Sequence, residues 1–250
     1  MSLFGIGEAA LVAGMVAEPV THTPLDYVLF VIVVVIVPLL SFRTGRAMAR
    51  VRPMSLVPRY WSTIVKALFL AALVIAAWLW AGRPFAQLGL DWPIGFKGQI
   101  GFAIAAFVAA YYTYATLIRH VPEERIEIVR TRLEKLRIVP ETQEEFRLFP
   151  LVALVGSTME ELLYRGYLIW LLAPFASLWG AAVISSILFG FGHVYQGALG
   201  IVRTGLIGFA FALGYVLTGS LWWLIVVHIM VNLFGGALAW RMQRLAPTTS

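Results

Sequence analysis

Long apolar segments separated by short polar stretches dominate the chain from residue 27 onward. A helix that crosses a bilayer needs about 20 mostly apolar residues, and its backbone must satisfy its own hydrogen bonds in the lipid. The pattern therefore predicts an all-α protein, a polytopic transmembrane helix bundle of about seven (seven to eight) spans. The predicted spans are residues 27–42, 61–82, 99–118, 150–172, 176–195, 199–217 and 221–240.

The amino-acid composition supports a membrane protein. Hydrophobic residues make up 60% of the 250 residues and charged residues only 13%, whereas a soluble domain has roughly 25% charged residues. The mean hydropathy is +0.85. The chain has no cysteine, which excludes disulfides, thiolate metal sites and a catalytic thiol.

The basic residues predict the orientation in the membrane. The net charge is +6, and Lys and Arg of membrane proteins accumulate in cytoplasmic loops. We therefore expect the lipid bilayer, and no nucleic acid, as the surrounding partner. The basic clusters follow the first and third spans, which places the N-terminus outside and the C-terminus in the cytoplasm, in a plasma (inner) membrane. An eighth span near the N-terminus would move that terminus inside.

Four parts are expected along the chain. Residues 1–24 form an interfacial segment and residues 25–118 carry accessory transmembrane helices. Residues 119–148, where acidic and basic residues mix at helical spacing, form a cytoplasmic polar connector helix. Residues 149–245 form a transmembrane core that holds most of the membrane-embedded ionisable residues. Lys66 in the second span has a side chain long enough to reach the interface, so we expect no function for it.

Three charged residues lie close together in the fourth predicted span. They are Glu160, Glu161 and Arg165, and a charge at the centre of a bilayer costs about 2.5–3.5 kcal/mol on insertion scales. Glu161 and Arg165 are four residues apart on one helix face, which predicts an ion pair. Glu160 points about 100° away and has no evident partner on its own helix.

Two histidines and an asparagine lie in the later spans. His193 ends the fifth span, and His228 and Asn232 share one face of the seventh. Taken singly, each can be a packing residue or a hydrogen bond between helices. Packed around one pocket with Glu160, they can hold a water molecule, remove its proton and stabilise an oxyanion.

Three motifs in this order resemble the CPBP family of intramembrane proteases, the CAAX prenyl protease and bacteriocin-processing proteins, also called Abi or type II CAAX proteases. The resemblance covers about residues 145–240. The motifs are Glu160-Glu161-x-x-x-Arg165, Phe189-x-x-x-His193 and His228-x-x-x-Asn232.

This resemblance implies an intramembrane endopeptidase that hydrolyses a peptide bond in a membrane-associated protein or peptide. The substrate would be a CAAX-type prenylated tail or a leader peptide. Glu160, assisted by His193, would activate water, and His228 with Asn232 would form the oxyanion site. Structural support would come from Glu161, Arg165 and Phe189.

The metal requirement has two alternatives. The chain has no His-Glu-x-x-His motif, which favours a glutamate protease without a metal cofactor. A carboxylate and two imidazoles are also a zinc-ligand set. The zinc ligands would be Glu160, His193 and His228.

The predicted boundaries put the site residues at different depths. Glu160 and His228 would lie near the middle of the membrane and His193 near the cytoplasmic end, a mismatch of about 10–15 Å. A fifth helix that continues past Tyr195, or a fourth that begins before Pro150, would remove the mismatch.

Three other functions compete with proteolysis. A non-catalytic scaffold of the same fold would regulate a membrane partner, and it should tolerate Glu160→Gln. A proton-coupled transporter would use the buried Glu and His as a relay, but it predicts internal repeats, and none is evident. A serine protease is disfavoured because Ser157 and Ser185 have no nucleophile motif around them, and both are expected to be small packing residues.

Overall fold

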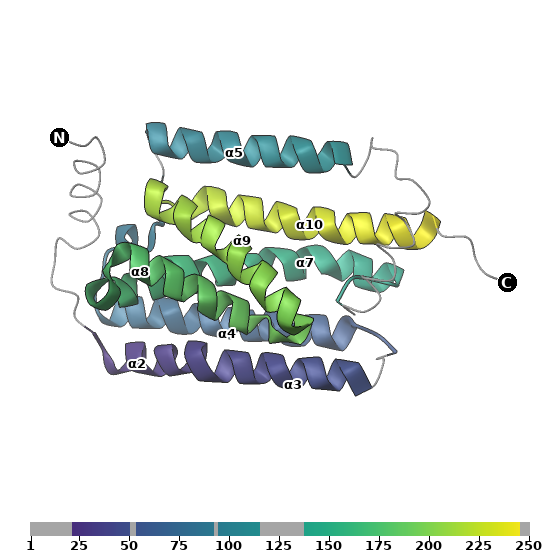
Figure 1. Cartoon of the computed structure of the whole chain (residues 1–250), viewed down its shortest axis with the longest axis horizontal. Coiled ribbons are helices and arrows are strands. Elements are labelled where there is room, and N and C mark those ends of the chain that lie inside the picture. Colours follow the sequence, from purple (N-terminus) through teal and green to yellow (C-terminus); the bar gives the residue numbers. More distant parts are fainter. Residues whose placement is uncertain (1–21, 51–53, 93–94, 116–137, 246–250) are drawn as a thin grey trace.

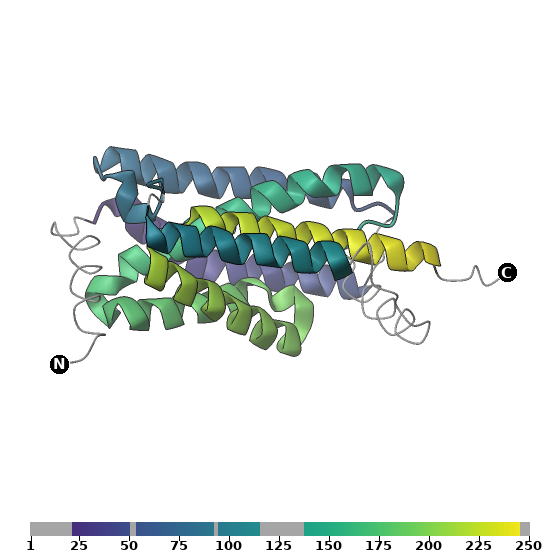
Figure 2. The ribbon, with the colours of Figure 1, turned by 90° about the horizontal axis from the view of Figure 1, so that it is seen from above.

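The protein is a bundle of long helices. The computed structural model describes residues 22–50, 54–92, 95–115 and 138–245, and no strand occurs among them. The helices run roughly along the long axis of the molecule, except α9, which is inclined (Figure 1, Figure 2). The predicted all-α fold is confirmed. The elements are α2 (Pro24–Val31), η1 (Ile32–Ile36), α3 (Val37–Arg50), α4 (Val57–Trp80), η2 (Phe85–Leu88), α5 (Phe96–Thr113), α7 (Gln143–Glu160), η4 (Glu161–Leu168), α8 (Ile169–Gly192), η5 (Val194–Gln196), α9 (Gly197–Thr218) and α10 (Trp222–Leu245).

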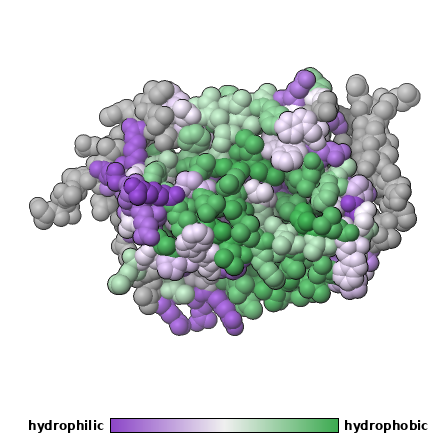
Figure 3. Space-filling view, turned by 180° about the vertical axis from the view of Figure 1, so that it is seen from behind, coloured by the Kyte–Doolittle hydropathy of each residue, from purple (hydrophilic) through white to green (hydrophobic). Residues whose placement is uncertain are grey.

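Five stretches of the described chain are long and apolar enough to cross a membrane. One of them, Gln143–Gly192, contains the fourth predicted span and the fifth up to residue 192. The third predicted span corresponds to α5, which is helical but is not among the five. The count of seven spans therefore stays a prediction. One face of the molecule shows a broad apolar belt with polar residues toward its two ends, as expected of a bundle in a bilayer (Figure 3). The stretches are Pro24–Met48, Val57–Trp80, Gln143–Gly192, Val194–Thr218 and Trp222–Arg244.

Two predicted boundaries differ from the structure. The first helical stretch continues without a break through α2, η1 and α3 to Arg50, eight residues beyond the expected end at residue 42. The expected connector at 119–148 lies mostly outside the described residues, but its last part belongs to α7, which begins at Gln143 rather than at Pro150. A capping box starts α7 there, because the side chains of Thr142 and Glu145 bond each other's backbone amides. The interfacial segment at 1–24 lies almost entirely outside the described residues.

A helical hairpin carries the fourth and fifth predicted spans. The chain runs through α7, η4 and the first part of α8 and turns at Ser177, whose backbone angles (φ 60°, ψ 167°) are not helical. The Ser177 hydroxyl then accepts a hydrogen bond from the amide of Gly180 at 3.3 Å and caps the returning arm. This arm packs closely on α9, since a Cβ added at Gly190 would lie 2.7 Å from the carbonyl oxygen of Ile201.

A buried ion pair joins the first helix to the rest of the bundle. Asp26 in α2 is fully buried, and its carboxylate accepts hydrogen bonds from Arg83 at 3.0 and 2.6 Å. The hydroxyl of Tyr167 in η4 donates to the same carboxylate at 2.9 Å. The guanidinium of Arg83 also lies 4.3 Å from the centroid of the Trp170 ring. These contacts fix the start of α2 against the hairpin.

Candidate active site

One cavity of about 840 Å³ brings together all four residues predicted to be catalytic. Its wall is formed by η1, α3, α4, α7, η4, the end of α8, η5 and α10. Within the region expected to be accessory at 25–118, η1, α3 and α4 therefore line the same cavity as the expected core. The predicted site residues on its wall are Glu160, His193, His228 and Asn232.

The carboxylate of Glu160 lies between two imidazole rings. Its Oε1 is 3.8 Å from Nε2 of His193, and its Oε2 is 3.5 Å from Nε2 of His228. All three side chains are partly exposed, Glu160 most of all at 24%. A carboxylate that faces two ring nitrogens beyond direct hydrogen-bond distance is well placed to share a water molecule with them.

Glu160 and His193 do not differ in depth as expected, because the distance of each residue from the hairpin turn sets its height in the bundle. Glu160 lies 17 residues before Ser177, and His193 lies 16 residues after it. The two arms of a hairpin run antiparallel, so residues equally far from the turn reach the same height. Of the two changes expected to remove the mismatch, the structure shows the second: the fourth predicted span belongs to a helix that begins at Gln143, before Pro150.

The orientation of His193 follows from its neighbour one turn earlier. Nδ1 of His193 lies 2.8 Å from the carbonyl oxygen of Phe189. A carbonyl oxygen only accepts, so Nδ1 carries a proton, and in the neutral ring Nε2 presents its lone pair toward Glu160. The Phe189 ring also packs at 4.7 Å from the His193 ring. A hydrogen-bond acceptor at Nε2 suits a residue that helps to hold or remove a proton.

Glu161 has two partners rather than one. Its Oε1 accepts from Arg165 at 3.0 Å, which confirms the predicted ion pair, and it also lies 2.7 Å from Nδ1 of His228. Glu161 and Arg165 are almost completely buried, and the guanidinium is stacked 4.3 Å from the Phe189 ring. A carboxylate only accepts, so Nδ1 of His228 carries the proton of this hydrogen bond, and the bond fixes the ring's orientation. Glu161 thus directs Nε2 of His228 into the cavity.

Asn232 is held by a residue that the sequence suggested only as packing. Its Nδ2 donates to the hydroxyl of Ser157 at 2.9 Å, and Ser157 is buried. The expected packing role is therefore incomplete, because Ser157 also orients an amide group of the site. Ser185 is buried as expected and donates to the Tyr164 carbonyl at 2.6 Å.

Tyr195 is a cavity residue that the sequence did not indicate. It lies two residues after His193, and its hydroxyl accepts from Nε2 of Gln196 at 3.0 Å. Its backbone amide donates to Ser41 of α3 at 3.2 Å. No helical spacing relates α3 to this segment, so only the packing of the bundle reveals the contact.

Metal binding is a separate question. Within the residues that the structure describes, no group of three or more His, Asp or Glu side chains is arranged to hold a metal ion. The alternative that Glu160, His193 and His228 bind zinc stays a prediction.

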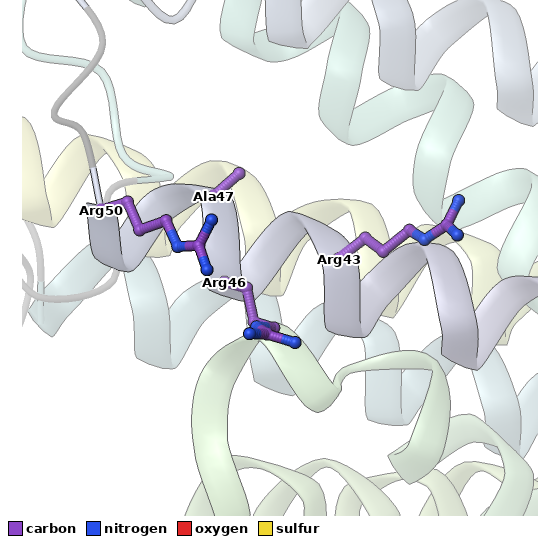
Figure 4. A pocket seen from close by; sticks show the side chains of 4 residues that line it. All are labelled: Arg43, Arg46, Ala47 and Arg50. Atoms are coloured by element: carbon purple, nitrogen blue, oxygen red, sulfur yellow. The ribbon is translucent and has the colours of Figure 1, made fainter.

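A second, shallow pocket lies on α3 and is formed mainly by arginines. Figure 4 shows three guanidinium groups spread along this helix. Ala47 lines this pocket and the large cavity. The arginines are Arg43, Arg46 and Arg50.

The comparisons with known proteins agree with the three motifs. Residues 142–234 match the family model described as Type II CAAX prenyl endopeptidase Rce1-like. No curated protein and no solved structure matches the chain. The matched region contains the whole hairpin, α9 and the part of α10 that carries His228 and Asn232. Over residues 142–234 the chain is therefore similar to the Rce1-like type II CAAX prenyl endopeptidases, which confirms the resemblance predicted from the motifs.

Proposed function

We propose that the protein is an intramembrane endopeptidase in which Glu160 activates the water that attacks the peptide bond. The family match supports peptidase activity, and the apolar helices support an integral membrane protein. The observation that carries the proposal is the position of the Glu160 carboxylate, 3.5 and 3.8 Å from two imidazole nitrogens in a single cavity. The substrate is a membrane-associated protein or peptide, such as a prenylated CAAX tail or a leader peptide.

The first step is attack by water on the scissile carbonyl carbon. Glu160, assisted by Nε2 of His193, takes one proton from the water as the oxygen–carbon bond forms. The carbonyl oxygen becomes an oxyanion, which accepts hydrogen bonds from Asn232 and from Nε2 of His228. The His228 ring donates at Nε2 in its doubly protonated form, which the Glu161 carboxylate at Nδ1 stabilises. The Asn232 amide has two hydrogens and Ser157 accepts only one, so the other remains for the substrate.

The second step is cleavage of the carbon–nitrogen bond. The proton held by Glu160 passes to the leaving nitrogen, and the products are a carboxylic acid and an amine. One oxyanion donor typically contributes about 2.7–4 kcal/mol to catalysis. Glu161, Arg165 and Phe189 act through the groups that they position.

Substitution of Glu160 tests the proposal. Glu160→Gln keeps the size of the side chain but removes the base, and we expect cleavage to fall about 10²- to 10⁴-fold. Membranes from cells that carry the wild type or the variant are compared for protein fragments that depend on Glu160. The matched control is Glu144→Gln, an exposed carboxylate in the first turn of the same helix α7. If no fragment depends on Glu160 while a membrane partner still co-purifies with both forms, the chain is a non-catalytic scaffold.

We also propose an N-terminus outside the cell and a C-terminus in the cytoplasm of an inner membrane. The chain has no cysteine, so single cysteines report the orientation directly. We expect Met54→Cys, between α3 and α4, to react with an impermeant maleimide only after permeabilisation, and Asp91→Cys, before α5, to react in intact cells. The opposite pattern contradicts the orientation.

A further inference from the structure

A polar stripe on α4 faces the cavity that holds Glu160. Arg59, Thr63 and Lys66 are spaced four and three residues apart, and all line the cavity. Residues at this spacing lie on one face of a helix. One turn further along the same face the wall becomes apolar, with Phe69 and Leu70. The cavity is therefore polar at one end and apolar at the other along α4.

Lys66 is an unusual residue to find on this wall. It lies nine residues after the start of α4 at Val57, in a stretch of mean hydropathy 2.1. Its ammonium group has no hydrogen bond or ion pair with any residue that the structure describes. A charge inside a membrane helix is costly and normally marks a functional pathway or a partner. Lys66 is exposed on the cavity wall, so its ammonium group is accessible to a ligand that enters the cavity.

The charges around the cavity indicate the sign of the charge on that ligand. Arg59 and Lys66 are the cationic side chains of the lining at neutral pH, and Glu160 is the carboxylate among the described residues that line it. Glu160 faces the two histidines. Lys66 is a cation of this lining with no carboxylate beside it among the described residues, which favours an anionic ligand.

We infer that Lys66 binds the carboxylate at the C-terminus of the substrate peptide. The inference rests on the proposed function, because it assumes that a peptide lies in the cavity with its scissile bond at Glu160. A C-terminal carboxylate is the negative charge that every peptide end carries, and an ammonium group pairs with it as a point charge. The apolar residues of the wall accommodate the neighbouring side chains of the peptide. Glu160 lies on α7 and Lys66 on the adjoining helix α4. The distance between these two side chains then sets how many residues are released from the C-terminus of the substrate.

The substrate itself provides the sharpest test. A fluorescent S-farnesylated CAAX peptide is prepared with a free C-terminal carboxylate and, separately, with a C-terminal amide. We expect wild-type kcat/KM to favour the acid about 10- to 100-fold, the range for one hydrogen bond to a charged group. Lys66→Met should lower the rate on the acid to that on the amide and leave the amide rate unchanged, and Lys66→Arg should restore part of the preference. Lys97→Met removes an exposed lysine from α5, outside the cavity, and should behave as wild type.

Binding to an inactive protein separates this inference from the proposed function. Binding of the acid and amide peptides is measured on Glu160→Gln with and without Lys66→Met. We expect the acid to bind more tightly only when Lys66 is present, even if neither peptide is cleaved. An acid preference that survives in Lys66→Met, or an equal loss of both peptides, overturns the inference and leaves Lys66 as a lipid-facing or structural residue. Loss of the Glu160 dependence of cleavage overturns the proposed function instead.

Discussion

Glu161 contacts both a structural arginine and a histidine of the site, so its two roles can be separated by substitution. Glu161→Gln removes the charge that balances Arg165, and both side chains are almost completely buried. Breaking a buried ion pair by removing one partner costs about 3–5 kcal/mol. At about 2–4 °C per kcal/mol for a protein of this size, Tm should fall by about 6–20 °C.

The double variant Glu161→Leu with Arg165→Met removes both charges together. An apolar pair of similar volume often replaces a buried ion pair at little cost, and a methionine fits beside the Phe189 ring that Arg165 now covers at 4.3 Å. We expect Tm to recover most of its loss, although the Gly208 carbonyl loses a donor at 3.1 Å. Catalysis should not recover, because Nδ1 of His228 no longer has the carboxylate at 2.7 Å.

Two measurements on the same purified protein decide the matter. Thermal unfolding in detergent gives Tm, and cleavage of the S-farnesylated CAAX peptide gives kcat. The double variant should stay about 10²- to 10⁴-fold below wild type in kcat, the scale seen when a carboxylate behind a catalytic imidazole is neutralised. If kcat returns to within about threefold of wild type together with Tm, then Glu161 only balances Arg165, and its proposed action on His228 is wrong.

Three further predictions concern the buried ion pair of Asp26 and Arg83, the helical hairpin and the metal. Asp26→Asn should lower the free energy of unfolding by about 3–5 kcal/mol, because Arg83 loses its buried carboxylate. The kcat per folded molecule should stay unchanged. A fall in kcat at a low temperature, where the variant is folded, would contradict a purely structural role. Gly190→Ala should destabilise the protein by about 1–3 kcal/mol, because the added Cβ meets the Ile201 carbonyl. The control Gly235→Ala, where an added Cβ has nothing within 4 Å, should leave Tm nearly unchanged. Equal shifts of Tm in the two variants would refute the close contact between α8 and α9. Dialysis against a strong chelator should leave peptide cleavage intact, and a loss that zinc restores would instead assign zinc to the site.

The sequence predicts the site better than it predicts the helix boundaries. Spacings of four residues are intrinsic to a helix, so the Glu161–Arg165 pair and the shared face of His228 and Asn232 follow directly from the residue numbers. The height of His193 does not follow from hydropathy, because apolar residues continue on both sides of the true helix end. The height of His193 follows instead from the number of residues that separate it from the turn at Ser177.

Contacts between distant segments were outside the reach of the sequence. Asn232 and Ser157 are 75 residues apart, and His228 and Glu161 are 67 apart. Hydropathy assigns such residues to helices but does not fix the rotation of one helix against another. The Lys66 side chain illustrates the same limit, since only the packing of α4 beside α7 shows that it faces a cavity.

The buried contacts that Asp26 makes with Arg83 and Tyr167 have a consequence for biosynthesis. Asp26 is synthesised 57 residues before Arg83 and 141 residues before Tyr167. Chains grow at about 5–20 residues per second, so Asp26 waits about 3–11 s for its first partner and about 7–28 s for the second. An unpaired aspartate inside the hydrocarbon would cost about 2.5–3.5 kcal/mol. We therefore expect the start of the first helix to stay in contact with water while the later helices are made, and to reach its final depth as the hairpin is inserted.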